Sequence, residues 1–367
     1  MAQSTTRSPA RTHPGAVCPV WDREERKGLD YFANLMEKPY IFFLGDVKDD
    51  LSAKTSRGIA DWRPEQCVGE HRLPGCGTTL GLEELGFEEA VARGAKTLVL
   101  GVANAGGVID ENWVPGLVDA VEAGLDVASG LHQRLTDIPE LREAAKKHGR
   151  ALYDVRHPVV PLTVGTGEKR TGKRLLTVGT DCSVGKMYTT LALDKEMRQR
   201  KFRVDFRATG QTGIFIAGEG ISVDAVVADF ISGAVETLSP ANDPDHWDLI
   251  EGQGSLFHPS FAGVSLGLLH GAQPDALVLC HEPNRPFMRG LPRRSLPEIQ
   301  ACLNANLEAA RLTNPNVRAV GISFNTAKME KAAALELMNR TEKQLGLPCV
   351  DPMVTSVAPI VERLAEP

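Results

Sequence analysis

The sequence lacks paired cysteines, a long apolar run and an excess of positive charge. Its seven cysteines are odd in number, scattered along the 367 residues and never paired at the spacing of metal ligands. This usage is typical of a reduced, cytoplasmic protein. The longest apolar runs, such as residues 97–102 and 276–280, have the length of buried strands and fall far short of the roughly 20 residues that a bilayer requires. We therefore expect a protein without a membrane span.

The charge balance limits the partners of the chain. Its 41 Lys and Arg residues against 47 Asp and Glu residues give a formal charge of −6, whereas nucleic acids select basic surfaces. We expect small-molecule ligands and no nucleic acid. The first dozen residues are rich in Ser, Thr, Arg and Pro and are followed by no apolar segment, so they do not form a secretory signal. We expect a disordered leader there.

Short apolar runs alternate with amphipathic helical patterns along two stretches of the chain. In the first stretch, strands are expected at 40–44, 97–102, 126–128 and 152–155, and helices at 82–93, 114–123 and 138–148. In the second stretch, strands are expected from 175, at 203–206, 247–250, 276–280 and 317–324, and helices at 186–200 and 297–312. This alternation predicts an α/β fold with parallel sheets covered on both faces.

The two stretches are separated by a segment typical of a linker. Residues 158–172 contain two prolines, three glycines and a polar run. We therefore predict an N-terminal extension over 1–37, a first α/β domain over 38–157, a linker over 158–172 and a second α/β domain over 173–367. Two domains in tandem leave a cleft between them, where ligands often bind.

The strongest motif is an apolar strand, a glycine-containing turn and a Gly-Lys pair that opens a helix. Its residues are Gly179, Thr180, Asp181, Cys182, Ser183, Val184, Gly185, Lys186 and Met187. Backbone N–H groups, the helix dipole and Lys186 favour a bound phosphate. Met187 stands where a magnesium-binding Ser or Thr is expected, and a thioether is a poor ligand for a hard cation. The motif predicts a loop that holds a phosphorylated ligand and requires no metal.

A second motif places a carboxylate at a strand end. The strand 247–250 runs into Glu251-Gly252-Gln253-Gly254, and ligands bind at the carboxyl edge of open α/β sheets. Glu251 there is suited to accept a proton, to hold a metal-bound water or to orient an amine. The two motifs together resemble the dethiobiotin synthetase branch of phosphate-loop proteins, from which Met187 departs.

A broader resemblance covers almost the whole chain from about residue 40. The strings at 49–62, 63–69, 73–77, 103–107, 179–187, 251–285 and 323–326 resemble the D-glutamate N-acetyltransferase family. The resemblance implies a Rossmann-like N-terminal domain and a phosphate-loop C-terminal domain. It also implies transfer of acetyl from acetyl-CoA to the amine of D-glutamate, giving N-acetyl-D-glutamate and CoA. Coenzyme A carries phosphates but needs no magnesium to be held, which agrees with Met187.

This reaction requires a base, and an acidic acceptor requires cations. The candidate bases are Glu251, which leads, and the histidines His258 and His281. Cys182 is either a small residue that clears the phosphate or an acetyl-carrying nucleophile. The residues predicted to bind the acceptor are Arg285, Arg289, Lys54, Arg63 and Asn104.

Two other functions stay open on the sequence alone. One is an ATP- and magnesium-dependent ligase or kinase similar to dethiobiotin synthetase. The other is a nucleotide-gated interaction protein without chemistry of its own. We expect a homodimer, and the sequence leaves the enantiomer of the acceptor and the identity of the base open.

Overall fold

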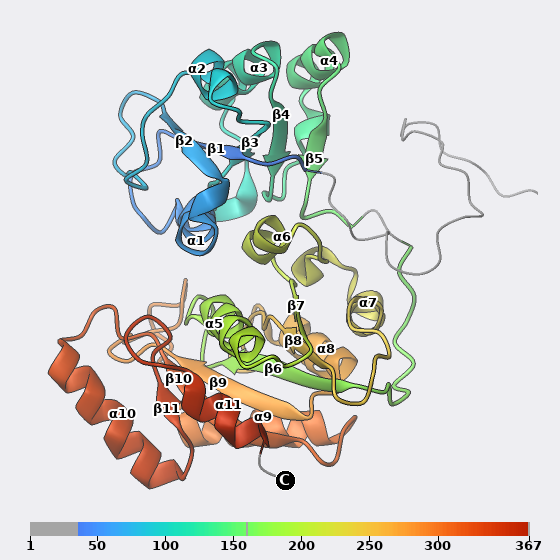
Figure 1. Cartoon of the computed structure of the whole chain (residues 1–367), viewed down its shortest axis with the longest axis vertical. Coiled ribbons are helices and arrows are strands. Elements are labelled where there is room, and N and C mark those ends of the chain that lie inside the picture. Colours follow the sequence, from blue (N-terminus) through green and yellow to red (C-terminus); the bar gives the residue numbers. More distant parts are fainter. Residues whose placement is uncertain (1–35, 159–160, 366–367) are drawn as a thin grey trace, which may run out of the picture. The chain divides into compact units, whose positions relative to one another are not determined.

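The computed structural model describes residues 36–158 and 161–365 of the chain. The expected leader and almost all of the extension over 1–37 lie outside the described residues. Over the described ranges the chain is an α/β protein with two parallel sheets, as predicted (Figure 1). None of the helices described there combines the length and the apolar character needed to cross a membrane.

The first sheet has five parallel strands in the order β2-β1-β3-β4-β5. The strands are β1 (Tyr40–Gly45), β2 (Cys67–Arg72), β3 (Thr97–Leu100), β4 (Asp126–Ser129) and β5 (Leu152–Asp154). The helices that follow them are α1 (Lys54–Trp62), α2 (Phe87–Ala92), α3 (Val114–Glu122) and α4 (Pro139–His148). Because β2 lies on one side of β1 and β3 on the other, the strand order reverses between β1 and β3, which is where ligands bind in such sheets.

The second sheet has six parallel strands in the order β11-β10-β9-β6-β8-β7. The strands are β6 (Lys173–Gly179), β7 (Val204–Arg207), β8 (Trp247–Ile250), β9 (Ala276–His281), β10 (Arg318–Phe324) and β11 (Cys349–Val350). The helices are α5 (Lys186–Gln199), α6 (Gln211–Ala217), α7 (Ile231–Leu238), α8 (Ala262–Ala272), α9 (Ile299–Arg311), α10 (Lys331–Leu345) and α11 (Ala358–Ala365). Strand β6 lies between β8 and β9, so the loop after β6 leaves the middle of the sheet (Figure 1).

The predicted strands and most predicted helices are found within three residues of their expected ends. The helix expected at 82–93 is an exception, because α2 begins only at Phe87. Glu83 and Leu85 pair instead with the backbone of Glu70 in β2, at 2.8 and 2.9 Å, which holds that segment extended. The described part of the expected linker, residues 158 and 161–172, contains no helix or strand.

Helix α1 and helices of the second α/β region share one apolar core. The core of the first sheet continues into Leu191 of α5 and into Ile214, Phe215 and Ile216 of α6. Across the same contact, the hydroxyl of Tyr188 donates to Asp61 at 2.5 Å. Apolar burial and this hydrogen bond therefore join the two sheets around the space between their carboxyl edges.

Candidate functional site

A cavity of about 790 Å³ lies where the loops after strands of both sheets meet. The first sheet contributes the segments that follow β1, β3, β4 and β5, and the second contributes those that follow all six of its strands. The residues predicted for the site that line it are Lys54, Asn104, Cys182, Ser183, Gly185, Lys186, Met187, Glu251 and Arg289. Those that do not line it are Arg63, Gly179, Thr180, Asp181, Val184, His258, His281 and Arg285.

The phosphate loop has the backbone of an anion cradle. Ser183 and Gly185 have positive φ angles of 53° and 101°, which turn the chain from β6 into α5. The N–H groups of Ser183, Val184 and Gly185 donate to no group in the described part of the chain. Lys186 donates to the carbonyl oxygens of Asp181 and Gly254 at 2.8 and 2.9 Å, and burial lowers its pKa. Free N–H groups at the start of a 14-residue helix favour a phosphate.

Neighbouring groups hold the side chains that follow Lys186 in the helix after the loop. Met187 packs toward α1, where its Cε would lie 3.1 Å from a Cβ on Gly58. The buried hydroxyls of Thr189 and Thr190 donate within their own helix, to the carbonyls of Gly185 and Lys186 at 3.0 and 2.8 Å. The same hydroxyls also contact those of Ser323 and Thr177, at 2.7 and 3.0 Å, so this part of α5 is tied to β10 and β6.

Asp181 joins the phosphate loop to the segment after β9. Its Oδ2 accepts from Nη1 of Arg285 and from the backbone N–H of Arg289, both at 2.8 Å. Arg285 also donates to the carbonyls of Cys182 and Ser183, at 2.7 and 2.8 Å. The structure thus places Arg285 against the back of the loop, whereas Arg289 lines the cavity and donates to the Ser183 hydroxyl.

Glu251 is a buried carboxylate that faces the same cavity. Its Oε2 accepts from the backbone N–H groups of Thr209 and Gly210 at 3.1 and 3.2 Å, and its Oε1 accepts from Gln253 at 3.1 Å. Burial raises the pKa of Glu251, whereas these hydrogen bonds and the charge of Lys186 lower it. The effect of burial is larger, and the resulting pKa is about 7. A carboxyl group with this pKa exchanges a proton near neutral pH, which suits a general base.

The two candidate histidines are held by the protein itself. Nδ1 of His258 accepts from the backbone N–H of Ser260 at 3.2 Å, so Nε2 carries the proton and donates to the carbonyl of Arg289 at 3.0 Å. Nδ1 of His281 lies 2.9 Å from the Thr180 hydroxyl. Burial, and to a smaller extent the positive charge of Arg285, lowers the pKa of His281 to about 4. Both imidazoles support the loops around the cavity without lining it.

Cys182 lines the cavity at the start of the phosphate loop. Burial raises the pKa of its thiol against the opposite effects of Lys186, Arg289 and Lys54. The thiolate that an acetyl-cysteine intermediate requires is therefore disfavoured.

Of the three polar residues predicted on the first-sheet side, Lys54 and Asn104 line the cavity. The ammonium of Lys54 has no hydrogen bond or ion pair within the described ranges, and burial lowers its pKa to about 8. The side chain of Asn104 donates to the carbonyl of Val108 at 2.7 Å, while its Oδ1 is buried without a partner. Arg63, also predicted there, instead donates to the carbonyl of Trp62 at 2.7 Å, outside the cavity.

Sequence reasoning missed Arg156, Asp224 and Gln211. Arg156 follows β5, is 8% exposed and forms an ion pair with Asp224, and both line the cavity. Gln211 opens α6, and its Oε1 is buried without a partner. The position of Arg156 at a strand's carboxyl end was the available signal, because ligand-binding side chains gather at that edge.

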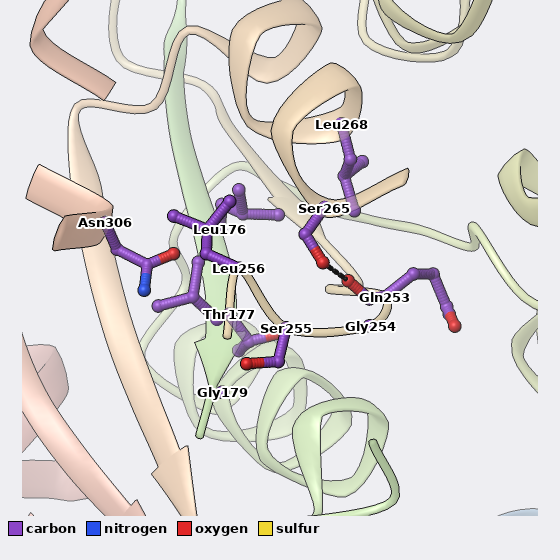
Figure 2. A pocket seen from close by; sticks show the side chains of 11 residues that line it. Leu176, Thr177, Gly179, Gln253, Gly254, Ser255, Leu256, Ser265, Leu268 and Asn306 are labelled. Carbon is purple, nitrogen blue, oxygen red and sulfur yellow. Dashed lines mark hydrogen bonds between the residues drawn. The ribbon is translucent and has the colours of Figure 1, made fainter. Parts of the chain in front are cut away.

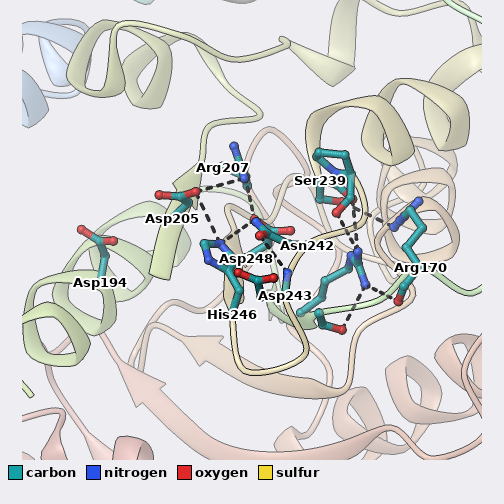
Figure 3. A network of polar contacts seen from close by, with 12 residues as sticks. Arg170, Asp194, Asp205, Arg207, Ser239, Asn242, Asp243, His246 and Asp248 are labelled. Carbon is teal, nitrogen blue, oxygen red and sulfur yellow. Dashed lines mark hydrogen bonds and ion pairs between the residues drawn. The ribbon is translucent and has the colours of Figure 1, made fainter. Parts of the chain in front are cut away.

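Two clusters in the described residues have the spacing of metal ligands, Asp181-Cys182-His258 and Asp205-His246-Asp248. In both, an arginine already neutralises the carboxylates. Arg285 binds Asp181, and Nε of Arg207 donates to the buried Asp248 at 2.7 Å (Figure 3). A metal ion would have to displace these guanidinium groups, so we assign no metal to either cluster.

A second, much smaller cavity lies beside β6 (Figure 2). Its volume is about 10 Å³, and Thr177, Ser265 and Asn306 are among its lining residues. Ser265 donates to the carbonyl of Gln253 at 2.8 Å, as drawn there. The volume is that of about one water molecule, which excludes it as a substrate site.

Comparisons with known proteins agree on the two-part architecture. The model of the DUF1611 N-terminal domain, described as Rossmann-like, matches residues 75–158, and that of the DUF1611 C-terminal domain, described as a P-loop domain, matches residues 163–361. Both are described as domains of unknown function. These matches agree with the predicted Rossmann-like and P-loop parts.

Two curated relatives carry a functional name. D-glutamate N-acetyltransferases from Pseudoalteromonas sp. and Tritonibacter scottomollicae are each 53% identical, over 90% of this chain and 99% of their own length. A crystal structure of a DUF1611 family protein from Anabaena variabilis is 30% identical, with a TM-score of 0.79 over 89% of this chain and 99% of that one. The chain therefore belongs to the DUF1611 family, the family of these two D-glutamate N-acetyltransferases.

Proposed function

We propose that this chain transfers an acetyl group from acetyl-CoA to the amine of D-glutamate, giving N-acetyl-D-glutamate and CoA. The observation that carries the proposal is that the phosphate loop and the buried Glu251 line one cavity. A site for phosphates and a base with a pKa of about 7 are the two parts that such a transfer needs. The names of the curated relatives support D-glutamate as the acceptor.

The phosphate loop fits the phosphates of coenzyme A. Ser183 and Gly185 line the cavity and their N–H groups have no partner in the described residues, and Lys186 and Arg289 add positive charge beside them. Lys186 would exchange its carbonyl partners for phosphate oxygens, which form stronger, charge-assisted hydrogen bonds. Acetyl-CoA would supply the acetyl group as a thioester, and Met187 at the position of the usual magnesium ligand is compatible with a coenzyme held without metal.

Glu251 is proposed as the general base. Above a pH of about 7 its carboxylate is ionised and can take a proton from the ammonium of the acceptor, which frees the amine for attack. The reaction forms one C–N bond and breaks one C–S bond. Of the two protons that the nitrogen loses, one leaves through Glu251 to solvent and the other ends on the thiol of CoA.

The test is a thiol-release assay of the purified chain with acetyl-CoA and matched D- and L-amino acids, with products identified by mass spectrometry. We expect equal amounts of CoA thiol and N-acetyl-D-glutamate, with turnover in the presence of EDTA. Absence of turnover with D-glutamate, or a requirement for ATP and magnesium with release of phosphate, would overturn the proposal.

A further inference from the structure

Part of the cavity has polar groups that the proposed chemistry leaves unused. Arg156, Lys54 and Gln211 line it; Arg156 lies in the loop after β5, whereas Lys54 and Gln211 open the helices α1 and α6 that follow β1 and β7. Resting on the proposed function, we propose that these residues form the acceptor subsite. Arg156 binds the side-chain carboxylate of the dicarboxylic amino acid, Lys54 binds its α-carboxylate, and the amide oxygen of Gln211 accepts from its ammonium.

The guanidinium of Arg156 is held at two of its three nitrogens. Its Nε donates to the carbonyl of Gly130 at 2.7 Å, and its Nη1 pairs with Asp224. Its Nη2 donates to nothing within residues 36–158 and 161–365. Asp224 is itself fixed, because its Oδ1 accepts from the Ser222 hydroxyl at 2.8 Å. A buried arginine held at two nitrogens presents its third to the cavity at little entropic cost, which suits a carboxylate.

Lys54 lines the same cavity as Arg156 and the phosphate loop. Burial lowers the pKa of its ammonium, and the charges of Arg289 and Arg156 lower it further, whereas the charge of Asp224, which pairs with Arg156, raises it. The ammonium has no hydrogen bond or ion pair within the described ranges, so a bound anion would stabilise it. The α-carboxylate is adjacent to the reacting amine, so a second cation in the same cavity as Arg156 is the appropriate partner for it.

Gln211 connects the arginine to the base. Its Oε1 would lie 2.0 Å from a Cβ on Gly130, whose carbonyl holds Arg156. The preceding residue, Gly210, donates its N–H to Glu251 at 3.2 Å. The oxygen of Gln211 is buried beside Gly130 without a partner, and a turn of this side chain toward the cavity would give it the ammonium as a donor. An ammonium bound there would lie in the part of the cavity that Glu251 also lines, where this carboxylate can take its proton.

The topology supports the same location. Lys54 follows β1, and Asn104 follows β3, so both stand at the point where the strand order of the first sheet reverses. The loop for the donor comes from β6 of the second sheet. In this proposal the first α/β region supplies Arg156 and Lys54 to the acceptor, and the second supplies the phosphate loop to the donor and Gln211 to the acceptor.

The first arm of the test compares D-glutamate with D-glutamine, which has the same shape without the side-chain charge. The double substitution Arg156→Gln with Asp224→Asn removes the ion pair as a unit. We expect it to lower kcat/KM for D-glutamate by about 100-fold and to change that for D-glutamine by less than about fivefold. An unchanged ratio of the two kcat/KM values in a folded variant would overturn the assignment of Arg156.

The second arm uses Lys54→Met, because Lys54 has no partner whose loss would unfold the chain. We expect KM for both amino acids to rise by about tenfold or more, since they share the α-carboxylate, with KM for acetyl-CoA unchanged. Lys96→Met is the matched control, because Lys96 is exposed in the same α/β region and does not line the cavity. Unchanged KM values in Lys54→Met would overturn the subsite.

The two proposals fail in different ways. If the wild-type chain acetylates neither amino acid, the proposed function is wrong. If the wild type is active and both variants keep its KM values and its substrate ratio, the function stands and the subsite is wrong.

Discussion

A Cβ on Gly252 would lie 1.6 Å from the carbonyl oxygen of Thr177, so the end of β8 lies directly against β6. The N–H of Gly252 also donates to the Thr177 hydroxyl at 2.9 Å. This contact brings Glu251, the residue before Gly252, beside the strand that carries the phosphate loop. The proposed base and the proposed donor site are therefore positioned by one backbone approach that only glycine permits.

We predict that Gly252→Ala lowers the free energy of unfolding by about 3 kcal/mol or more, because the added methyl group must push β8 away from β6. Chemical denaturation measures this change. Gly263→Ala in α8 is the control, since a Cβ there meets no atom within 4 Å, and it should stabilise the chain by up to about 1 kcal/mol. Equal stability of Gly252→Ala and wild type would contradict the close approach.

Glu251→Gln removes the proposed base while keeping the size of the side chain. We predict that it lowers kcat by about 10² to 10⁴-fold. In the wild type, log kcat/KM with D-glutamate should rise with pH and level off above a pH of about 7, where the carboxylate is ionised. The variant should lose that rise. A variant with wild-type kcat and an unaltered profile would exclude Glu251 as the base.

The same raised pKa predicts how stability depends on pH. Glu251 holds its proton up to a pH of about 7 in the folded chain but only up to about 4.5 when unfolded, so its contribution is complete below 4.5 and is lost as the pH rises through 7. Relative to Glu251→Gln, the free energy of unfolding of the wild type should fall by about 3 kcal/mol as the pH rises across this range. Denaturation of both proteins at pH 4.5, 6 and 7.5 measures the difference. A difference that does not change with pH would contradict the raised pKa.

His258 is expected to position Arg289 rather than to transfer protons. His258→Phe keeps the aromatic packing on Phe261 but removes the hydrogen bond to the Arg289 carbonyl. We predict that KM for acetyl-CoA rises by about tenfold, since a displaced Arg289 loses a charge-assisted contact, while the rise of kcat/KM through pH 7 persists. If His258→Phe abolished that rise and Glu251→Gln kept it, the base would be His258.

The strands predicted from the sequence are those in which apolar residues dominate, and β2 and α1, whose polar or small residues are accommodated by tertiary contacts, were missed. Strand β2 contains Glu70, which is fully buried and accepts from the Thr79 hydroxyl and the Leu80 N–H at 2.6 and 2.7 Å. Helix α1 contains Gly58, where a Cβ would lie 2.7 Å from Thr212 of α6. Neither contact can be predicted from a local sequence pattern, because the residues that contact Glu70 lie in a loop and the one that contacts Gly58 is distant in the sequence.

The sequence predicted site residues that follow directly from a local motif. It did not predict those whose role depends on a partner far away in the sequence. The phosphate loop and Glu251 each follow directly from a strand end, and both line the cavity. The pairing of Arg156 with Asp224 joins residues 68 positions apart. Likewise, the use of Arg285 behind the loop depends on the folded position of Asp181. The charge of a side chain alone does not tell whether the residue binds a substrate or, like Arg285, stabilises a loop.

The central claim is that the loop at 179–187 holds a coenzyme A thioester without metal. Calorimetric titration of the purified chain tests it most directly, with acetyl-CoA in EDTA in one cell and ATP with magnesium in another. We predict saturable binding of acetyl-CoA in EDTA, weakened by about tenfold or more in Lys186→Met, and no comparable binding of ATP. Binding of ATP that requires magnesium, with no binding of acetyl-CoA, would contradict the account.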